Sequence, residues 1–135
     1  MYLLDTNVLV DFLRGKNQYA LRMLRASNAG VFRIPSVVKA ELLLGVEKSA
    51  DPGPNRLKAE LLLLPFEVLP FDDRCALHYA RIRAHLEGKG MSIGANDYII
   101  AACAMAHGAT LVTNNVGEFQ RIPGLSVEQW AEVPF

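Results

Sequence analysis

Short apolar runs alternate along the chain with longer segments of helical hydrophobic spacing. The apolar runs are Tyr2–Leu4, Val31–Ile34, Phe66–Leu69 and Thr110–Val112. Runs of this length, separated by helices, are typical of βαβ units on a mostly parallel sheet. Because 135 residues is the size of one ordinary domain, we expect a single α/β domain over residues 1–135.

The segments between these runs predict helices. In chain order they are Val8–Leu13, Gln18–Ser27, Val37–Val46, Arg56–Leu64, a long helix from Asp72 or Asp73 to about Glu87, and a helix from Asn96 or Asp97 to His107. Ser36 is placed to cap the third helix. The turn-rich segment Ser49–Asn55 is expected to be a loop.

Charge and cysteine content narrow the class of protein. Fourteen basic residues balance 14 acidic ones, so no global basic field marks a nucleic-acid binder, although nucleic acid is not thereby excluded. Cys75 and Cys103 form no CxxC pair, which argues against a redox motif or a zinc ribbon and favours small buried thiols in a reducing cytosol. With no basic leader and no apolar run near the ~18 residues of a membrane span, we expect a soluble cytoplasmic protein.

Acidic residues interrupt the pattern at three places. Asp5 ends the first apolar run, Glu41 lies on or beside the buried stripe of the third helix, and Asp97 opens the alanine-rich helix "NDYIIAACAMA". Helix capping would account for Asp5 and Asp97. Considered without the other acids, the Glu41 side chain could simply reach water at the margin of the stripe or form an ion pair with Lys48. A further polar segment, "TNNVGEF", follows the fourth strand.

Taken together, these segments predict a metal site. In a parallel sheet the carboxyl ends of the strands, and the loops after them, gather along one edge. Carboxylates that close would repel one another, whereas Mg²⁺ or Mn²⁺ held by carboxylate oxygens, amide carbonyls and water removes the repulsion. Asp5 is then a metal ligand, and Thr6 and Asn7 orient it and cap the following helix.

The same residues carry a family resemblance. The chain contains, in this order, "LLDTNVLVDFL", "SVVKAELLLGVEKS", "LPFDDRCALHYARIRAHLEGKG", "IGANDYIIAACAMAHGATLVTNNVGEF" and "IPGLSVEQW". With this order and spacing it resembles the PIN-domain ribonucleases, and most closely the VapC toxins of bacterial type II VapBC toxin–antitoxin systems. The resemblance implies a three-layer α/β/α sandwich and an endoribonuclease that depends on Mg²⁺ or Mn²⁺.

The resemblance also assigns site residues. The family's three acidic metal-site positions correspond to Asp5, Glu41 and Asp97. Its supporting polar positions correspond to Thr6, Asn7 and Thr113. The fourth acid departs from the family, because Asn115 stands where many relatives have Asp. Either Glu118 substitutes for that acid, or Asn115 contributes a neutral oxygen.

A mechanism follows from this assignment. Water activated by the metal would attack an RNA phosphodiester and leave 5′-phosphate and 3′-hydroxyl ends. Asp5 and Asp97 would hold the principal ion, and Glu41 would complete its coordination or act as a base. The residues do not identify the RNA target. The family resemblance makes tRNA, and initiator tRNA in particular, the first candidate.

Partners are implied by the resemblance as well. We expect a homodimer, a toxin–antitoxin hetero-oligomer and a VapB-like antitoxin, with no role for a membrane. The antitoxin would cover apolar surface beyond the needs of one core. The residues that suggest such surface are Tyr19, Leu21, Met23, Leu24, Leu57 and Leu61–Leu64.

Other functions fit the residues less well. A histidine-based ribonuclease is poorly supported, because His78 and His85 lie seven apart on one helix and His107 ends another. A receiver-type signalling domain would need an acidic pair after the first strand and a Lys after the last strand. This chain has Thr6 and Asn7 at the first place and "TNNVGEF", without a Lys, at the second. The alternative from another class is a catalytically silent PIN-like module that only binds a partner, which the altered fourth acid leaves open.

Overall fold

The computed structural model describes residues 1–26 and 29–130, and it contains one five-stranded sheet. The strands are β1 (Tyr2–Leu4), β2 (Phe32–Pro35), β3 (Glu67–Leu69), β4 (Thr110–Val112) and β5 (Ser126–Glu128). Their order is β3-β2-β1-β4-β5, and each neighbouring pair is parallel. The α/β class and the four predicted strands are confirmed, and β5 is an additional strand.

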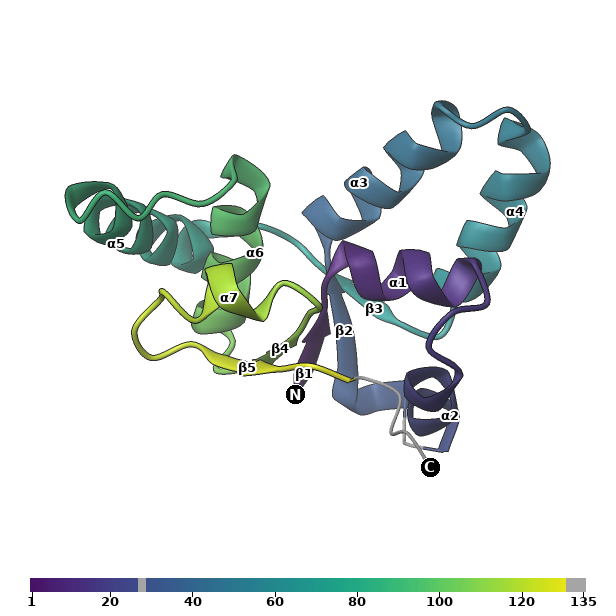
Figure 1. The fold of residues 1–135 in the computed structure, drawn as a ribbon, viewed down its shortest axis with the longest axis horizontal. Helices are drawn as coiled ribbons and strands as arrows, with labels where there is room; N and C mark the ends of the chain where they lie inside the picture. The colour runs from purple at the N-terminus through teal and green to yellow at the C-terminus, as the bar shows by residue number, and fades with distance from the viewer. Residues whose placement is uncertain (27–28, 131–135) are drawn as a thin grey trace.

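Helices cover the sheet and connect the strands. They are α1 (Thr6–Leu13), α2 (Gln18–Ala26), α3 (Ser36–Glu47), α4 (Pro52–Leu63), α5 (Asp73–Gly88), α6 (Ala95–Ala106) and α7 (Val116–Phe119), with a 3₁₀ turn η1 (Ala29–Val31) before β2. Figure 1 shows the strands in the middle of the molecule, with α5 and α6 on one side and α1, α3 and α4 on the other. This arrangement is the expected α/β sandwich.

Two details of the predicted helices were wrong. Ser36 does not cap α3: it is the first helical residue, and Pro35, which still pairs with Leu69 in the sheet, stands at the N-cap without a side-chain hydrogen bond. The segment Ser49–Asn55 is only partly a loop, because α4 begins at Pro52. A proline is tolerated in the first helical turn, where its missing N–H has no intrahelical partner. The predicted end of α2 at Ser27 lies outside the described residues.

Part of the core lies where the inner strands meet α6. Leu3, Leu4, Leu111 and Val112 are fully buried, as is the face of α6 that carries Ala101, Ala102 and Ala104. The small alanine side chains let α6 approach the sheet and α5 closely. No helix in the described part of the chain is long and apolar enough to span a membrane.

Both cysteines are buried and free, as predicted. Burial raises the pKa of the Cys75 thiol. Burial and the neighbouring Cys75 raise the pKa of Cys103 to about 12. Both side chains are therefore protonated thiols in the protein without a bound ligand.

The chain's one tryptophan closes the end of the sheet at which β1 and β2 begin. The Trp130 ring meets Phe32 edge to face, with the ring centroids 5.4 Å apart, and it also contacts Tyr2. Its indole N–H donates to Glu128 Oε2 at 3.2 Å. Its carbonyl accepts a hydrogen bond from the Asn17 side chain, which lies just before α2. Trp130 therefore connects β5, the two central strands and the α2 region.

Candidate active site

The acidic edge of the sheet starts at Asp5, where β1 passes directly into α1. Its backbone is extended and its N–H donates to the Val112 carbonyl at 2.9 Å, so it continues the sheet pairing. Its carboxylate accepts from the N–H of Thr6 at 2.8 Å and caps α1. One residue therefore ends the strand, begins the helix and points a carboxylate along the edge. The capping role does not exclude a role in the site.

Asp5 is only 4% exposed and is held by three donors. Besides the N–H of Thr6, Oδ2 accepts from the hydroxyl of Thr113 at 2.7 Å and from the amide of Asn7 at 3.3 Å. Burial raises the pKa of Asp5 above its ordinary value, the Thr113 and Thr6 hydrogen bonds oppose that rise, and the charge of Glu41 adds to it. The supporting polar residues thus orient Asp5 and favour its charged form.

Glu41 reaches the edge from α3. Its Oε1 accepts from the Thr6 hydroxyl at 2.9 Å, so Thr6 connects two acids, one through its N–H and one through its hydroxyl. Within the described residues, Glu41 has no ion pair with Lys48. The side chain is half-buried, and it contributes charge to this edge instead of pairing along its own helix.

Asp97 lies in the first turn of α6, three residues after the N-cap, Gly94. Burial, followed by the charges of Asp5, Glu118 and Glu41, raises its pKa to about 6, and a hydrogen bond shared with the Glu118 side chain adds to the rise. The four acids are therefore coupled electrostatically. Gly94 makes room for the carboxylate, because a Cβ at that position would stand 3.2 Å from Asp97 Oδ2.

Glu118 and Asn115 both lie in this group. Glu118 is on the short helix α7, held by the fully buried Phe119 next to it. The Asn115 side-chain amide donates to Glu118 Oε2 at 3.0 Å, and the Asn115 N–H donates to the Thr113 hydroxyl at 3.0 Å. Glu118 therefore supplies a carboxylate next to Asp97, and Asn115 positions it.

Two residues outside the predicted set also belong to this edge. The N–H of Asn114 donates to Asn7 Oδ1 at 3.1 Å, and its side chain donates to Asp11 Oδ2 at 2.9 Å. These bonds tie the loop after β4 to α1. Asn114 stands in the segment "TNNVGEF" that the sequence singled out, whereas no local sequence pattern distinguishes Asp11.

The donor set fits a hard divalent cation. Within the described residues, the ion pairs join Arg33 to Glu67, Arg56 to Glu60 and Arg83 to Glu87, so none of them neutralises the acidic edge. Carboxylate and amide oxygens are the ligands that Mg²⁺ and Mn²⁺ prefer. Over the same residues, no three carboxylate oxygens of the edge lie within 4.8 Å of one another. Mg²⁺ keeps several of its waters and is usually bound through one or two carboxylates, so it does not require such a group of three.

Comparison with known proteins gives consistent matches over nearly the whole chain. A family model described as "PIN domain" matches residues 2–125. The chain is 40% identical over 131 residues to "Ribonuclease VapC2" of Rickettsia felis, covering 96% of this chain and 98% of that protein. It is 37% identical over 129 residues to "tRNA(fMet)-specific endonuclease VapC" of Salmonella typhimurium, covering 96% and 97%.

Solved structures match equally well. The fold is similar to that in the crystal structure of DNA-bound VapBC from Salmonella typhimurium, with a TM-score of 0.91, 35% identity and coverage of 96% of this chain and 98% of that chain. It is also similar to VapBC2 from Rickettsia felis bound to a DNA fragment from their promoter, with a TM-score of 0.87, 41% identity and the same coverage.

Proposed function

The chain belongs to the PIN-domain family, and we propose that it is a metal-dependent endoribonuclease that acts as the toxin of a type II toxin–antitoxin system. The observation that carries the proposal is the group of four coupled carboxylates, Asp5, Glu41, Asp97 and Glu118, at one edge of the sheet. Such a group is costly to assemble unless a cation compensates it. The two relatives named above are a ribonuclease and a tRNA(fMet)-specific endonuclease, which supports RNA as the substrate.

Each acid has a distinct proposed role. Mg²⁺ or Mn²⁺, when bound, supplies Lewis-acid chemistry, polarising phosphoryl oxygens and acidifying water. Asp5 and Asp97, the two acids whose pKa burial raises, hold the ion. Thr6 fixes Oε1 of Glu41, which leaves Oε2 to accept a proton from the attacking water. Glu118, oriented by Asn115, is the fourth acid and orients water next to Asp97.

The direct test is RNA cleavage by the purified protein with Mn²⁺. Wild type should cut RNA, EDTA should stop it, and Asp5→Ala should abolish it. Asp51→Ala is the matched control, because Asp51 is exposed and its side chain caps nothing within the described residues. Equal RNA loss with Asp5→Ala would point to a contaminating nuclease. No cleavage by folded wild type would favour the silent partner-binding module.

The fourth acid can be tested in the same assay. We expect Glu118→Gln to lower the rate by an order of magnitude or more, because it removes the charge next to Asp97. Asn115→Ala should cost less, since it removes only a hydrogen bond that positions Glu118. A larger loss with Asn115→Ala than with Glu118→Gln would contradict this assignment and would favour the Asn115 oxygen.

Attack by water predicts that the 2′-hydroxyl takes no part in cleavage. An RNA with a single 2′-deoxy nucleotide at the cut site should still be cleaved and should yield a 5′-phosphate. Failure to cut that substrate, or a cyclic phosphate product, would contradict attack by water. Because one relative is named as specific for tRNA(fMet), initiator tRNA is the first substrate we propose, with elongator tRNAs as the comparison.

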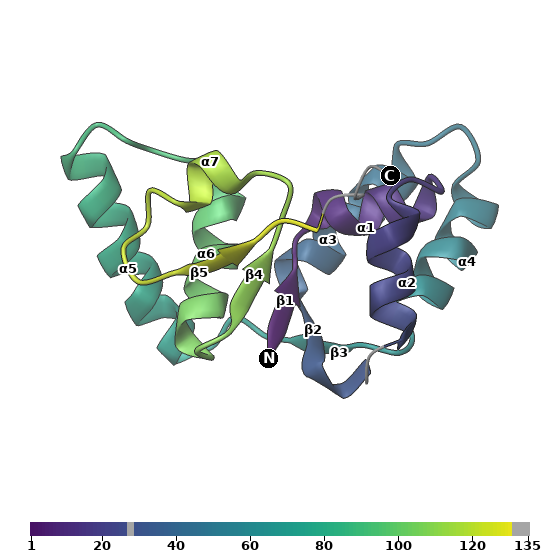
Figure 2. The same cartoon turned by 60° about the horizontal axis from the view of Figure 1, so that its bottom comes forward.

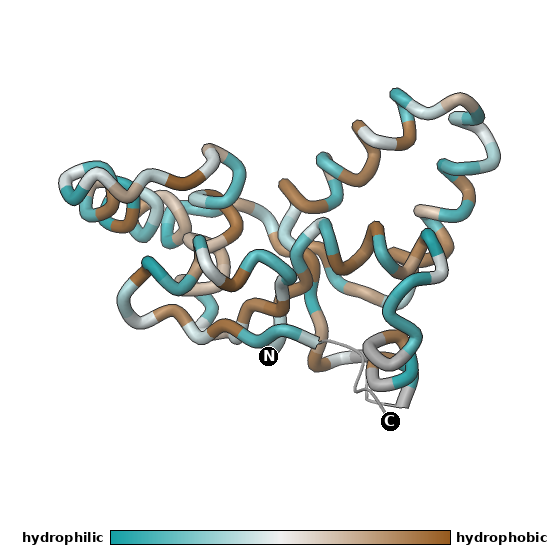
Figure 3. Tube along the Cα trace, in the orientation of Figure 1, coloured by the Kyte–Doolittle hydropathy of each residue, from teal (hydrophilic) through white to brown (hydrophobic). Residues whose placement is uncertain are grey.

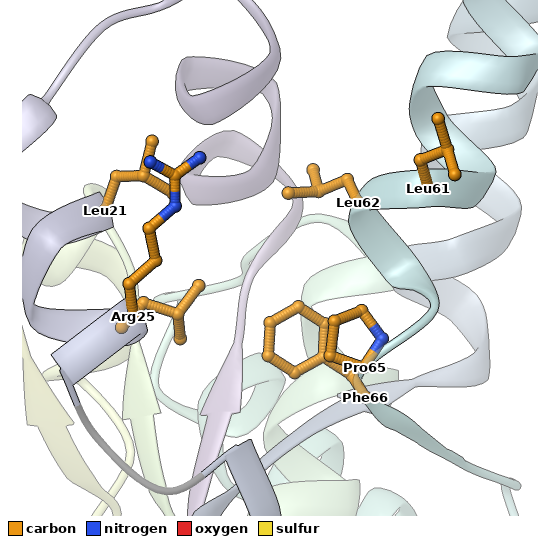
Figure 4. A pocket seen from close by; sticks show the side chains of 7 residues that line it. Leu21, Arg25, Leu61, Leu62, Pro65 and Phe66 are labelled. Atoms are coloured by element: carbon orange, nitrogen blue, oxygen red, sulfur yellow. The ribbon is translucent and has the colours of Figure 1, made fainter.

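An apolar surface between α2 and α4 is the proposed antitoxin site. Leu57, Leu61 and Leu64 are 59%, 61% and 79% exposed, and the apolar end of α4 faces the α2 region in Figures 2 and 3. An open hollow of about 410 Å³ lies between the two helices (Figure 4). Its lining residues are Leu21, Leu24, Arg25, Leu61, Leu62, Pro65 and Phe66. The side chains of Tyr19 and Met23, which the sequence grouped with them, lie outside the described residues.

Monomeric proteins rarely leave large apolar surface areas uncovered. The similar solved structures are VapBC complexes, and we infer that an apolar segment of a VapB-like antitoxin lies in this hollow. Leu61→Glu should weaken the complex with the co-expressed antitoxin while RNA cleavage is retained. Leu77→Glu is the control, since Leu77 is 51% exposed on α5. Equal loss of antitoxin with both variants would contradict the location.

A further inference from the structure

A second group of metal-ligating side chains lies near the carboxyl end of α6. Cys75 comes from the first turn of α5, Cys103 from the last turn of α6, and His107 is the C-cap of α6. One ligand atom from each residue lies within 4.8 Å of the other two. In the part of the chain that the structure describes, this is the one set of three His, Cys, Asp or Glu side chains with such spacing.

Local structure explains why these three side chains meet. Cys103 and His107 are four residues apart, so they share one face of the helix end. Asp72 caps α5 by accepting from the Cys75 N–H at 3.1 Å, which fixes the start of that helix. The Arg74 side chain donates to the Ala106 carbonyl and so ties the start of α5 to the end of α6.

One ring nitrogen of the histidine in this group lacks a hydrogen-bond partner among the described residues. Nε2 of His107 is buried, and among the described residues nothing donates to it or accepts from it. A buried polar nitrogen without a partner is unfavourable, and such atoms in native structures call for an unseen water, ion or functional role. Both neighbouring cysteines are free thiols, so each of the three side chains has a ligand atom available for a metal ion.

We propose that Cys75, Cys103 and His107 bind one Zn²⁺ ion through two thiolate sulfurs and the His107 imidazole. Sulfur and imidazole nitrogen are the ligands that Zn²⁺ prefers. Binding releases the two thiol protons to solvent, and the two thiolates balance the charge of the cation, so the buried centre is neutral. Three protein ligands leave the fourth position to water.

A disulfide is the competing use of the two cysteines. It would consume both sulfurs and leave His107 Nε2 without a partner, whereas a metal ion accounts for all three side chains.

This proposed zinc site also differs from the acidic edge in its ligands and in its position on α6. Cys103 is six residues beyond Asp97 on α6, which is about 9 Å along the helix axis. Oxygen ligands at one end and soft ligands at the other select different ions. The zinc would join α5 to the helix that carries Asp97.

The test is a Co²⁺ titration of the reduced, metal-free full-length protein. A thiolate-to-cobalt charge-transfer absorption should appear, saturate at one ion per chain and disappear when Zn²⁺ is added. The doubly substituted protein with Asp5→Asn and Asp97→Asn should keep this absorption, because the acidic edge supplies no sulfur. Cys103→Ala should abolish it, and His107→Gln should weaken ion binding.

Thermal unfolding gives a second readout. Zn²⁺ should raise the Tm of wild type and of the acidic-edge variant, and should leave the Tm unchanged when Cys103→Ala is added to the acidic-edge variant. If Cys103→Ala does not fold, native mass spectrometry of the wild-type protein replaces that comparison. We expect a mass increase that corresponds to one bound zinc ion and the loss of two protons. The proposal is wrong if the folded, reduced wild type shows no thiolate-to-cobalt absorption, if Cys103→Ala retains it, or if the two cysteines are recovered as a disulfide without zinc.

Discussion

Replacing Asp97 with asparagine should stabilise the metal-free protein while it abolishes RNA cleavage. Burial and three neighbouring acids raise the pKa of Asp97 from 3.8 to about 6 in the folded protein. Because the folded-state pKa lies above the unfolded one, the folded state binds more protons between these values. Stability therefore falls as the pH rises from about 4 to about 6, and the ionised carboxylate destabilises the fold above that interval.

The size of the effect follows from the shift. Two pH units correspond to about 3 kcal/mol. Asp97 is only half-buried, and solvent screening reduces the expected value to about 1–2 kcal/mol. For a chain of this length, the free-energy gain in Asp97→Asn should raise the Tm by roughly 3–8 °C.

Urea denaturation in EDTA, followed by circular dichroism, measures this difference. Asp97→Asn should be more stable than wild type at about pH 8 and equal to it at about pH 4, where the wild-type carboxyl is protonated. Asp51→Asn, at an exposed site, should show no such difference. Mn²⁺ should then favour wild type, which alone binds it tightly. The reasoning is refuted if the variant is no more stable at the higher pH, or if its advantage is the same at both.

Three further substitutions test how the edge is built. Thr113→Val removes the hydroxyl that donates to Asp5 and should lower the free energy of unfolding by about 1–3 kcal/mol; a loss as large in Thr113→Ser would contradict this. Gly94→Ala places a methyl group against the Asp97 carboxylate, so the cleavage rate should fall several-fold while urea denaturation changes little; unchanged kinetics would show that the carboxylate has room to move. Phe119→Ala empties a fully buried position on α7 and should lower the free energy of unfolding by about 3–5 kcal/mol in urea denaturation, with a smaller loss for Phe119→Leu.

Much of the acidic edge was predictable because sheet topology, not side-chain detail, gathers it. Asp5 follows an apolar strand and Asp97 opens a helix, and parallel strands bring such positions to one edge. The coupling of both to Glu41 and Glu118 agrees with that argument. Whether Glu118 or Asn115 supplies the fourth oxygen was left open by the sequence, because the hydrogen bond between them depends on the turn of α7.

Other features depend on contacts that local patterns do not contain. The strand β5 has three residues, none of them fully buried, and its pairing with β4 is extended by the bond from the Thr113 N–H to the Glu128 carbonyl. The helix α4 begins at Pro52, because proline is tolerated in the first turn of a helix. The turn-rich composition of Ser49–Asn55 predicted a loop there instead. The group of Cys75, Cys103 and His107 joins two helices, so a search for closely spaced cysteines does not detect it.

The position of Trp130 makes the chain's own fluorescence a selective reporter. The indole packs on Tyr2 and Phe32, where β1 and β2 begin, whereas the carboxylates stand where the strands end. Emission excited at this single chromophore therefore follows the opening of the sheet and the α2 region. Unfolding of this part of the molecule can therefore be recorded without a dye.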